Sequence, residues 1–153
     1  MNVVVKLLRS ISTEVSAGIA PLFDRGGRSI EDAFREGLSN WMRISAEHRS
    51  LLVAVAEEWP AVPELRRIWF ELLGNVTTAL AELIDADRAA GLAPAGADSA
   101  PLAASLIWGT ERGFQVAMTG RDAALTDEQA IVEPLVQLYV GTIYGRAVRG
   151  SAG

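Results

Sequence analysis

Apolar side chains recur at intervals of three and four residues along almost the whole chain. The first such stripe runs over residues 2–24 and includes Val4, Leu8, Ile11 and Val15. This spacing places apolar side chains on one face of an α-helix, whereas a half-buried strand would alternate at every second residue. The sequence contains no convincing strand and no internal repeat. It therefore predicts an all-α fold of about six helices.

Local signals divide the chain into these helices. The pair Gly26-Gly27 ends the first one, and Pro60 ends a short one. Ser29, with Asp32 three residues later, forms a capping-box pattern that starts a helix. The expected helices cover residues 2–24, 30–46, 49–59, 63–90 and 99–119, with a last helix ending near residue 147.

Two further boundaries follow from residues with special backbone preferences. Gly91 stands where a left-handed cap would end the longest helix, before a loop at 92–101. Thr126 and Gln129 form a second capping-box candidate ahead of the last helix. Pro134 lies inside that helix, so it either kinks the helix or marks its true start.

Composition and charge exclude several classes of function. The 153 residues include no cysteine and a single histidine, His48, which excludes disulfides, thiolate nucleophiles and multi-histidine metal sites. No phosphate loop, dinucleotide fingerprint or zinc spacing occurs, so we expect no cofactor and no metal. The net charge of −5 argues against nucleic-acid binding by these residues. With no membrane span and no signal peptide recognised, we expect one cytoplasmic domain at residues 1–150.

Glu111 and Arg112 form a charged pair on an otherwise apolar helix and allow two interpretations. Both side chains could face solvent or a neighbouring helix. Alternatively, Glu111 lines a cavity, where it needs a partner because a buried carboxylate is costly. His48 is expected to be a surface or capping residue. An enzyme would have to use Glu111 with Arg112, or His48, and the sequence places no second acid or base beside them.

The four tryptophans also allow two interpretations. Trp41, Trp59, Trp69 and Trp108 all lie on apolar stripes, where ordinary core packing would explain them. Aromatic side chains on several non-adjacent helices can also converge around a small-molecule cavity. Composition alone leaves both interpretations open.

Four short motifs follow one another along the chain: LRRIW at 65–69, ALAELIDADRAAG at 79–91, SLIWGTERGF at 105–114 and LVQLYVGTIYGRA at 135–147. Together they resemble the C-terminal half of TetR-type transcriptional regulators, most closely the ethionamide-resistance repressor branch. The resemblance extends over essentially the whole chain. It implies a helical bundle that binds a small apolar effector and forms a homodimer through its last two helices.

The resemblance also implies which residues carry these two functions. The residues that would line the effector cavity are Phe34, Leu38, Trp41, Trp69, Val76, Ile107, Thr110, Phe114 and Tyr139. The residues that would pair with a second subunit are Leu102, Leu106, Gly109, Gly113, Leu135, Leu138, Thr142 and Ile143. The two glycines would permit close helix crossing.

The DNA-reading head of the family, a helix-turn-helix unit, has no counterpart in these residues. Residues 1–24 resemble the linker helix that follows that head. The leading hypothesis is therefore a ligand-sensing, dimerising domain whose effector moves the first helix and controls DNA binding by a head outside this sequence. One alternative is a headless, stand-alone protein that dimerises with a relative or sequesters a ligand. A small-molecule enzyme is the third.

Overall fold

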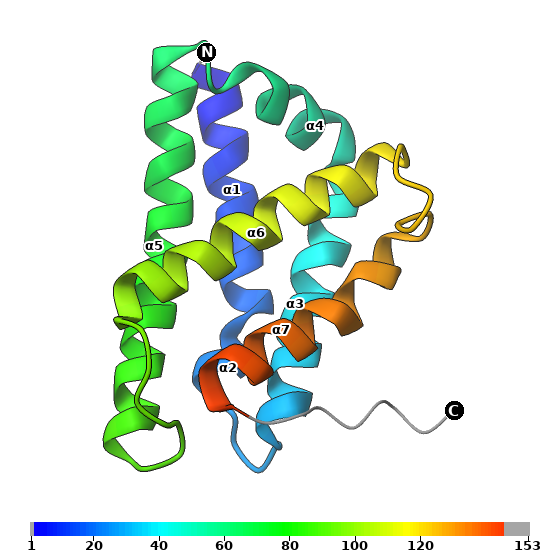
Figure 1. Cartoon of the computed structure of the whole chain (residues 1–153). Helices are drawn as coiled ribbons and strands as arrows, with labels where there is room; N and C mark the ends of the chain where they lie inside the picture. The colour runs from blue at the N-terminus through cyan, green and yellow to red at the C-terminus, as the bar shows by residue number, and fades with distance from the viewer. Residues whose placement is uncertain (1, 146–153) are drawn as a thin grey trace.

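Helices make up most of residues 2–145, the part of the chain that the computed structural model describes (Figure 1). They are α1 (Asn2–Gly18), α2 (Ala20–Phe23), α3 (Ile30–Glu47), α4 (Arg49–Glu58), α5 (Pro63–Ala89), α6 (Ser99–Thr119), the 3-10 turn η1 (Glu128–Ile131) and α7 (Val132–Tyr144). This range contains no strand, so the all-α prediction is confirmed. No helix within it is long and apolar enough to cross a lipid bilayer.

The segment expected as one helix over residues 2–24 is divided into α1 and α2. The break falls at Ile19, whose backbone has φ −91° and ψ −1°. Pro21 explains the break, because it has no N–H to donate and its ring is tolerated only in the first turn of a helix. It therefore stands near the start of α2 rather than inside a continuous helix.

The helices form a bundle crossed by a second layer (Figure 1). Helices α1 and α5 run side by side in the same direction, and α3 returns beside α1. Helices α6 and α7 run in opposite directions across the front of these three, with α6 against α5 and α7 against α3. One continuous hydrophobic core joins all of these helices.

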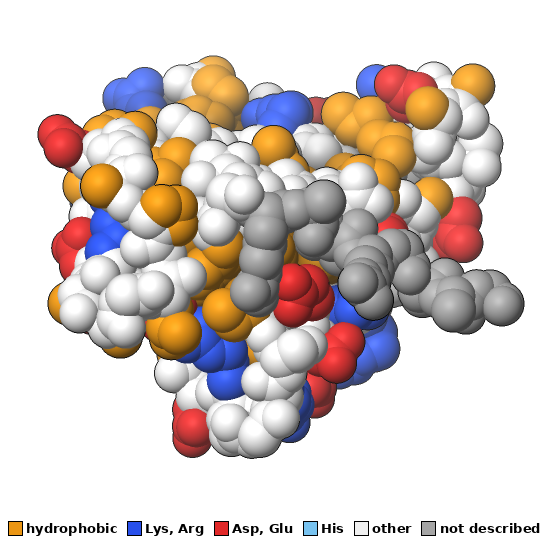
Figure 2. Space-filling model, turned by 60° about the horizontal axis from the view of Figure 1, so that its bottom comes forward, with side chains coloured by type: hydrophobic (Ala, Val, Ile, Leu, Met, Phe, Trp, Pro, Cys, Tyr) orange, Lys and Arg blue, Asp and Glu red, His pale blue; other side chains and the backbone are white. Residues whose placement is uncertain are grey.

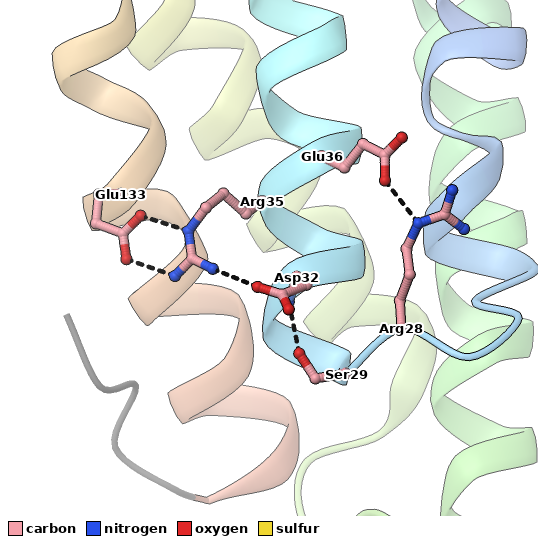
Figure 3. A network of polar contacts seen from close by, with 6 residues as sticks. All are labelled: Arg28, Ser29, Asp32, Arg35, Glu36 and Glu133. Carbon is pink, nitrogen blue, oxygen red and sulfur yellow. Dashed lines mark hydrogen bonds and ion pairs between the residues drawn. The ribbon is translucent and has the colours of Figure 1, made fainter. Parts of the chain in front are cut away.

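The start of α3 is fixed by the predicted cap and by an ion pair to α7 (Figure 3). The Ser29 hydroxyl accepts a hydrogen bond of 3.1 Å from the Asp32 backbone N–H, which confirms the capping pattern. Arg35 donates two hydrogen bonds of 2.9 and 2.8 Å to the Glu133 carboxylate. A third, of 2.9 Å, goes to Asp32. This bidentate arrangement fixes the position of α7 relative to α3.

The later boundaries largely follow the sequence signals. Gly91 has a φ of +75°, in the left-handed region that was expected beyond the end of α5. Asp127, one residue after the predicted Thr126, caps η1 by accepting a 3.0 Å hydrogen bond from the Gln129 N–H. Pro134 lies in the first turn of α7, so it marks the start of that helix. The expected end near residue 147 lies outside the described residues.

Three distant segments meet at Asp87, near the end of α5. Arg25 donates two hydrogen bonds of 2.9 Å to the Asp87 carboxylate, and the Tyr144 hydroxyl donates a third of 2.5 Å. Burial alone would raise the pKa of Asp87, but the hydrogen bonds from Arg25 and Tyr144 outweigh it and hold the pKa below its usual value. This buried carboxylate is therefore fully paired.

Among residues 2–145, the side chains at the end of the bundle that carries α2 include both charge signs (Figure 2). Figure 2 shows acidic and basic side chains intermixed on this face, with hydrophobic ones between them. A face that binds nucleic-acid phosphates would gather lysine and arginine instead.

Candidate ligand-binding cavity

A cavity of about 90 Å³ lies between α1, α3, α4, α5 and α6. One water molecule needs roughly 10–15 Å³ measured in this way, so the space is large enough for a small organic molecule. Its wall is mainly apolar and aromatic, as in small-molecule sites generally. The lining residues are Leu8, Ile11, Ser12, Val15, Trp41, Ser45, Leu52, Trp69, Leu72, Leu73, Val76, Glu111, Phe114, Gln115 and Met118.

Helix α1 supplies one side of the wall. Leu8, Ile11 and Val15 repeat at intervals of three and four and are buried, so they form the inner face of that helix. Ser12 lies on the same face and adds a half-buried hydroxyl. A molecule in the cavity would therefore contact α1 directly.

Helix α6 supplies the opposite side through Glu111, Phe114, Gln115 and Met118. These residues also repeat at three and four, so they share one face of the helix. The Gln115 amide makes a long hydrogen bond of 3.5 Å to the backbone carbonyl of Val53 on α4. This face thus combines two polar side chains with two apolar ones.

The aromatic part of the wall comes from three helices. Trp41 of α3 and Phe114 of α6 pack edge to face, with ring centroids 5.4 Å apart. Trp69 of α5 lines the cavity beside them, and its indole N–H has no hydrogen-bond partner among residues 2–145. Buried tryptophans usually pair this group, and here the N–H lies near the Glu111 carboxylate without making a hydrogen bond of ordinary geometry.

Glu111 is the charged residue of the wall. Its side chain is 6% exposed, and Oε1 has no hydrogen-bond partner in the described part of the chain. Arg112 approaches Oε2 at 3.8 Å, but the Arg112 side chain is 54% exposed and points its charge toward water. Burial raises the pKa of Glu111, and the nearby Arg112 charge and Trp69 N–H oppose that rise only in part.

Comparison with known proteins identifies the family. A family model described as "Transcriptional regulator EthR, C-terminal domain" matches residues 34–145. The chain belongs to this family. The match begins inside α3, so it contains most of the cavity wall but not α1.

A curated relative of the same family aligns with a slightly longer part of the chain. The HTH-type transcriptional regulator EthR of Mycolicibacterium smegmatis (strain ATCC 700084 / mc(2)155) is 28% identical over 120 residues. The aligned part is 78% of this chain and 55% of that protein, so the chain spans about half the length of its relative. The resemblance to the C-terminal half of TetR-type regulators is thus confirmed. The family is one of transcriptional regulators and not a class of enzymes.

The predicted EthR-type lining residues fall into two groups. The group that lines the cavity is Trp41, Trp69, Val76 and Phe114. The group that is buried outside its wall is Phe34, Leu38, Ile107, Thr110 and Tyr139. The second group packs between α3, α6 and α7, where Thr110 Oγ1 and Tyr139 Oη lie 2.6 Å apart. Their role in ligand binding stays a prediction.

On α6, the residues predicted from the EthR resemblance and the residues that line the cavity lie on two neighbouring faces of the helix. The prediction used the helix face at Ile107, Thr110 and Phe114, whereas the cavity meets the neighbouring face, which shares only Phe114 with it. Adjacent helix positions point about 100° apart, so a shift of one position changes which side chains reach the cavity. The useful signal was the pair Glu111 and Gln115, two polar residues four apart on an apolar helix.

The two tryptophans not in the cavity form a separate aromatic cluster. Trp59 and Trp108 pack around Phe70, with ring centroids 5.6 and 5.0 Å from it. His48 lies at the junction of α3 and α4, as expected, with its Nε2 3.2 Å from Glu14 Oε1. Neither feature belongs to the cavity wall.

The predicted dimer residues also divide by exposure. Leu106, Leu135 and Ile143 are buried within the chain's own core, and Leu102 and Gly113 are half-buried. The outward residues are Gly109, Leu138 and Thr142. A Cβ at Gly109 would meet open space, whereas one at Gly113 would approach Ile131 Cδ1 to 2.6 Å. Gly113 therefore permits close packing inside this chain, and the intersubunit contacts stay a prediction.

Proposed function

We propose that this chain is the effector-sensing and dimerising domain of a TetR-type transcriptional regulator that works in the cytoplasm. The cavity is its effector site, and a head outside this sequence carries DNA binding. Membership of the EthR C-terminal family supports this assignment. The mainly apolar cavity supports a small apolar effector and a binding role rather than catalysis.

One observation carries the proposal: α1 forms part of the cavity wall. A molecule in contact with Leu8 and Ile11 of α1 also contacts Trp69 of α5 and Phe114 of α6. Its affinity then depends on how α1 lies against the other helices. A ligand that prefers one position of α1 tenfold biases that equilibrium by about 1.4 kcal/mol. Since α1 resembles the linker to the head, this bias would reach the DNA-binding unit.

Dimerisation would use the outward faces of α6 and α7. Gly109 has open space around its Cα, and Leu138 is 50% exposed on α7. Leu138 offers a second copy an apolar contact, and the open space at Gly109 leaves room for close approach.

A cavity-filling variant tests the effector site. We choose 2-phenylethanol as the probe, because one aromatic ring with a short polar tail suits the wall. Binding is measured by titration calorimetry on the wild type, on Val76→Phe, and on the control Val3→Phe. Val76 is half-buried in the cavity wall, whereas Val3 is 70% exposed.

We expect Val76→Phe to weaken binding at least fivefold, because the phenyl ring takes up the space of the probe. Val3→Phe should match the wild type. Equal affinity for all three proteins would place binding outside the cavity and overturn the proposal.

A further inference from the structure

Glu111 distinguishes this cavity from a purely apolar one. Among the described lining residues it alone has an ionisable side chain, and its Oε1 has no partner there. A buried oxygen without a hydrogen bond lowers the stability of the fold, and more so if it carries charge. A chain that keeps such a group inside an apolar wall has an acceptor available for a ligand.

The other buried carboxylate, Asp87, is hydrogen-bonded within the described part of the fold, whereas Glu111 Oε1 is not. Both carboxylates are buried, with side chains 6% exposed. Asp87 receives two hydrogen bonds of 2.9 Å from Arg25 and another from Tyr144. Glu111 Oε1 accepts no hydrogen bond among residues 2–145; the Arg112 guanidinium is 3.8 Å from Oε2, and the Trp69 N–H lies close enough to lower the pKa of the carboxyl. The fold therefore completes one buried carboxylate and leaves the other open to the cavity.

The surroundings of Glu111 favour a cationic group over a neutral one. A hydrogen bond from an ammonium ion to a carboxylate is about twice as strong as one between neutral groups. Trp41, Trp69 and Phe114 belong to the same wall, and aromatic faces also attract cations. The remaining lining is largely aliphatic, which suits an apolar body attached to that cation.

We propose that the effector of this domain is a small amine with an apolar body, whose ammonium group binds Glu111 Oε1. This inference rests on the proposed function, because it takes the cavity to be the effector site. It names the chemical class of the effector and the residue that selects it. Gln115 and Ser45, the other buried polar residues on the wall, are placed to complete the hydrogen bonding of the amine.

A pair of nearly isosteric probes tests the proposal. At pH 7, 2-phenylethylamine is protonated, and 2-phenylethanol has the same shape without the charge. Titration calorimetry gives the dissociation constant of each probe for the wild type, for Glu111→Gln, and for the control Glu58→Gln. Glu58 is an exposed carboxylate on α4, and glutamine keeps the shape of glutamate in both variants.

We expect the wild type and Glu58→Gln to bind the amine at least tenfold more tightly than the alcohol, a difference of about 1.4 kcal/mol. Glu111→Gln should reduce that preference to within about twofold and leave affinity for the alcohol nearly unchanged. The wild-type comparison is a test by itself, independent of how the variant folds.

Three outcomes would overturn the inference. A preference for the amine that survives in Glu111→Gln would remove Glu111 as the selecting group. Equal affinity of the wild type for both probes would reject an amine effector while leaving the cavity as an effector site. Failure of both probes to bind the wild type would contradict the proposed function as well.

Discussion

Arg25 and Asp87 lie 62 residues apart in the sequence and are joined by two hydrogen bonds of 2.9 Å. Their pairing connects the loop after α2 to the end of α5. Tyr144, at the end of α7, donates to the same carboxylate. One buried charge therefore fixes three segments at the end of the bundle.

Replacing Asp87 by asparagine should destabilise the fold by about 3 kcal/mol, because it removes the buried carboxylate that pairs the partly buried Arg25 charge. Urea denaturation monitored by circular dichroism measures this loss. Glu71→Gln is the control, since Glu71 pairs with Arg9 on the surface and surface pairs contribute little. Equal losses in the two variants would contradict the structural role of the Asp87 pair.

The stability of the fold should fall in acid. The pKa of Asp87 is lowered in the folded state, so its contribution is complete above the unfolded pKa of about 3.9 and is lost as the pH falls through the folded value. Denaturation midpoints measured from pH 7 to pH 3 test this. The difference in denaturation midpoint between the wild type and Asp87→Asn should be constant above about pH 5 and should become smaller below about pH 4. A difference that stays constant to pH 3 would contradict the assignment.

Glu111 should have the opposite effect on stability. Burial raises the pKa of this residue, so the folded state binds the proton more tightly than the unfolded chain. Its charged form therefore costs stability at neutral pH, and the cost is relieved as the pH falls.

Glu111→Gln should accordingly raise the free energy of unfolding by about 1 kcal/mol at pH 7, with a smaller gain at pH 5. Glu58→Gln, at an exposed position, should leave stability unchanged. Thermal melts of both variants at the two pH values make the comparison. A lower stability of Glu111→Gln at pH 7 would show that the carboxylate is already satisfied in the fold.

The sequence predicted the helices well because burial repeats with the helix period. It missed the break at Ile19, where Pro21 interrupts an otherwise continuous stripe. It identified only part of the cavity wall, because α6 is apolar on several sides and contacts both the cavity and α7. Periodicity does not distinguish the face at Glu111 and Gln115 from the face at Thr110. That choice depends on how α6 is rotated against its neighbours, which is a tertiary property.

The proposed dimer can be tested with two matched leucines. Leu138 on α7 and Leu92 in the loop after α5 are 50% and 52% exposed, so neither is needed for the core. Sedimentation equilibrium should show a dimer for the wild type and for Leu92→Arg. Leu138→Arg should be a monomer, because it places a charge in the expected interface. A dimer that survives Leu138→Arg would exclude this face of α7.

Fluorine NMR of the chain labelled with 5-fluorotryptophan tests the central claim most directly. Trp41 and Trp69 line the cavity, whereas Trp59 and Trp108 lie in the separate cluster around Phe70. Single Trp→Phe variants assign the resonances. Titration with 2-phenylethylamine should shift the signals of Trp41 and Trp69 and leave those of Trp59 and Trp108 in place. Shifts confined to Trp59 and Trp108, or no shifts at all, would contradict an effector site in this cavity.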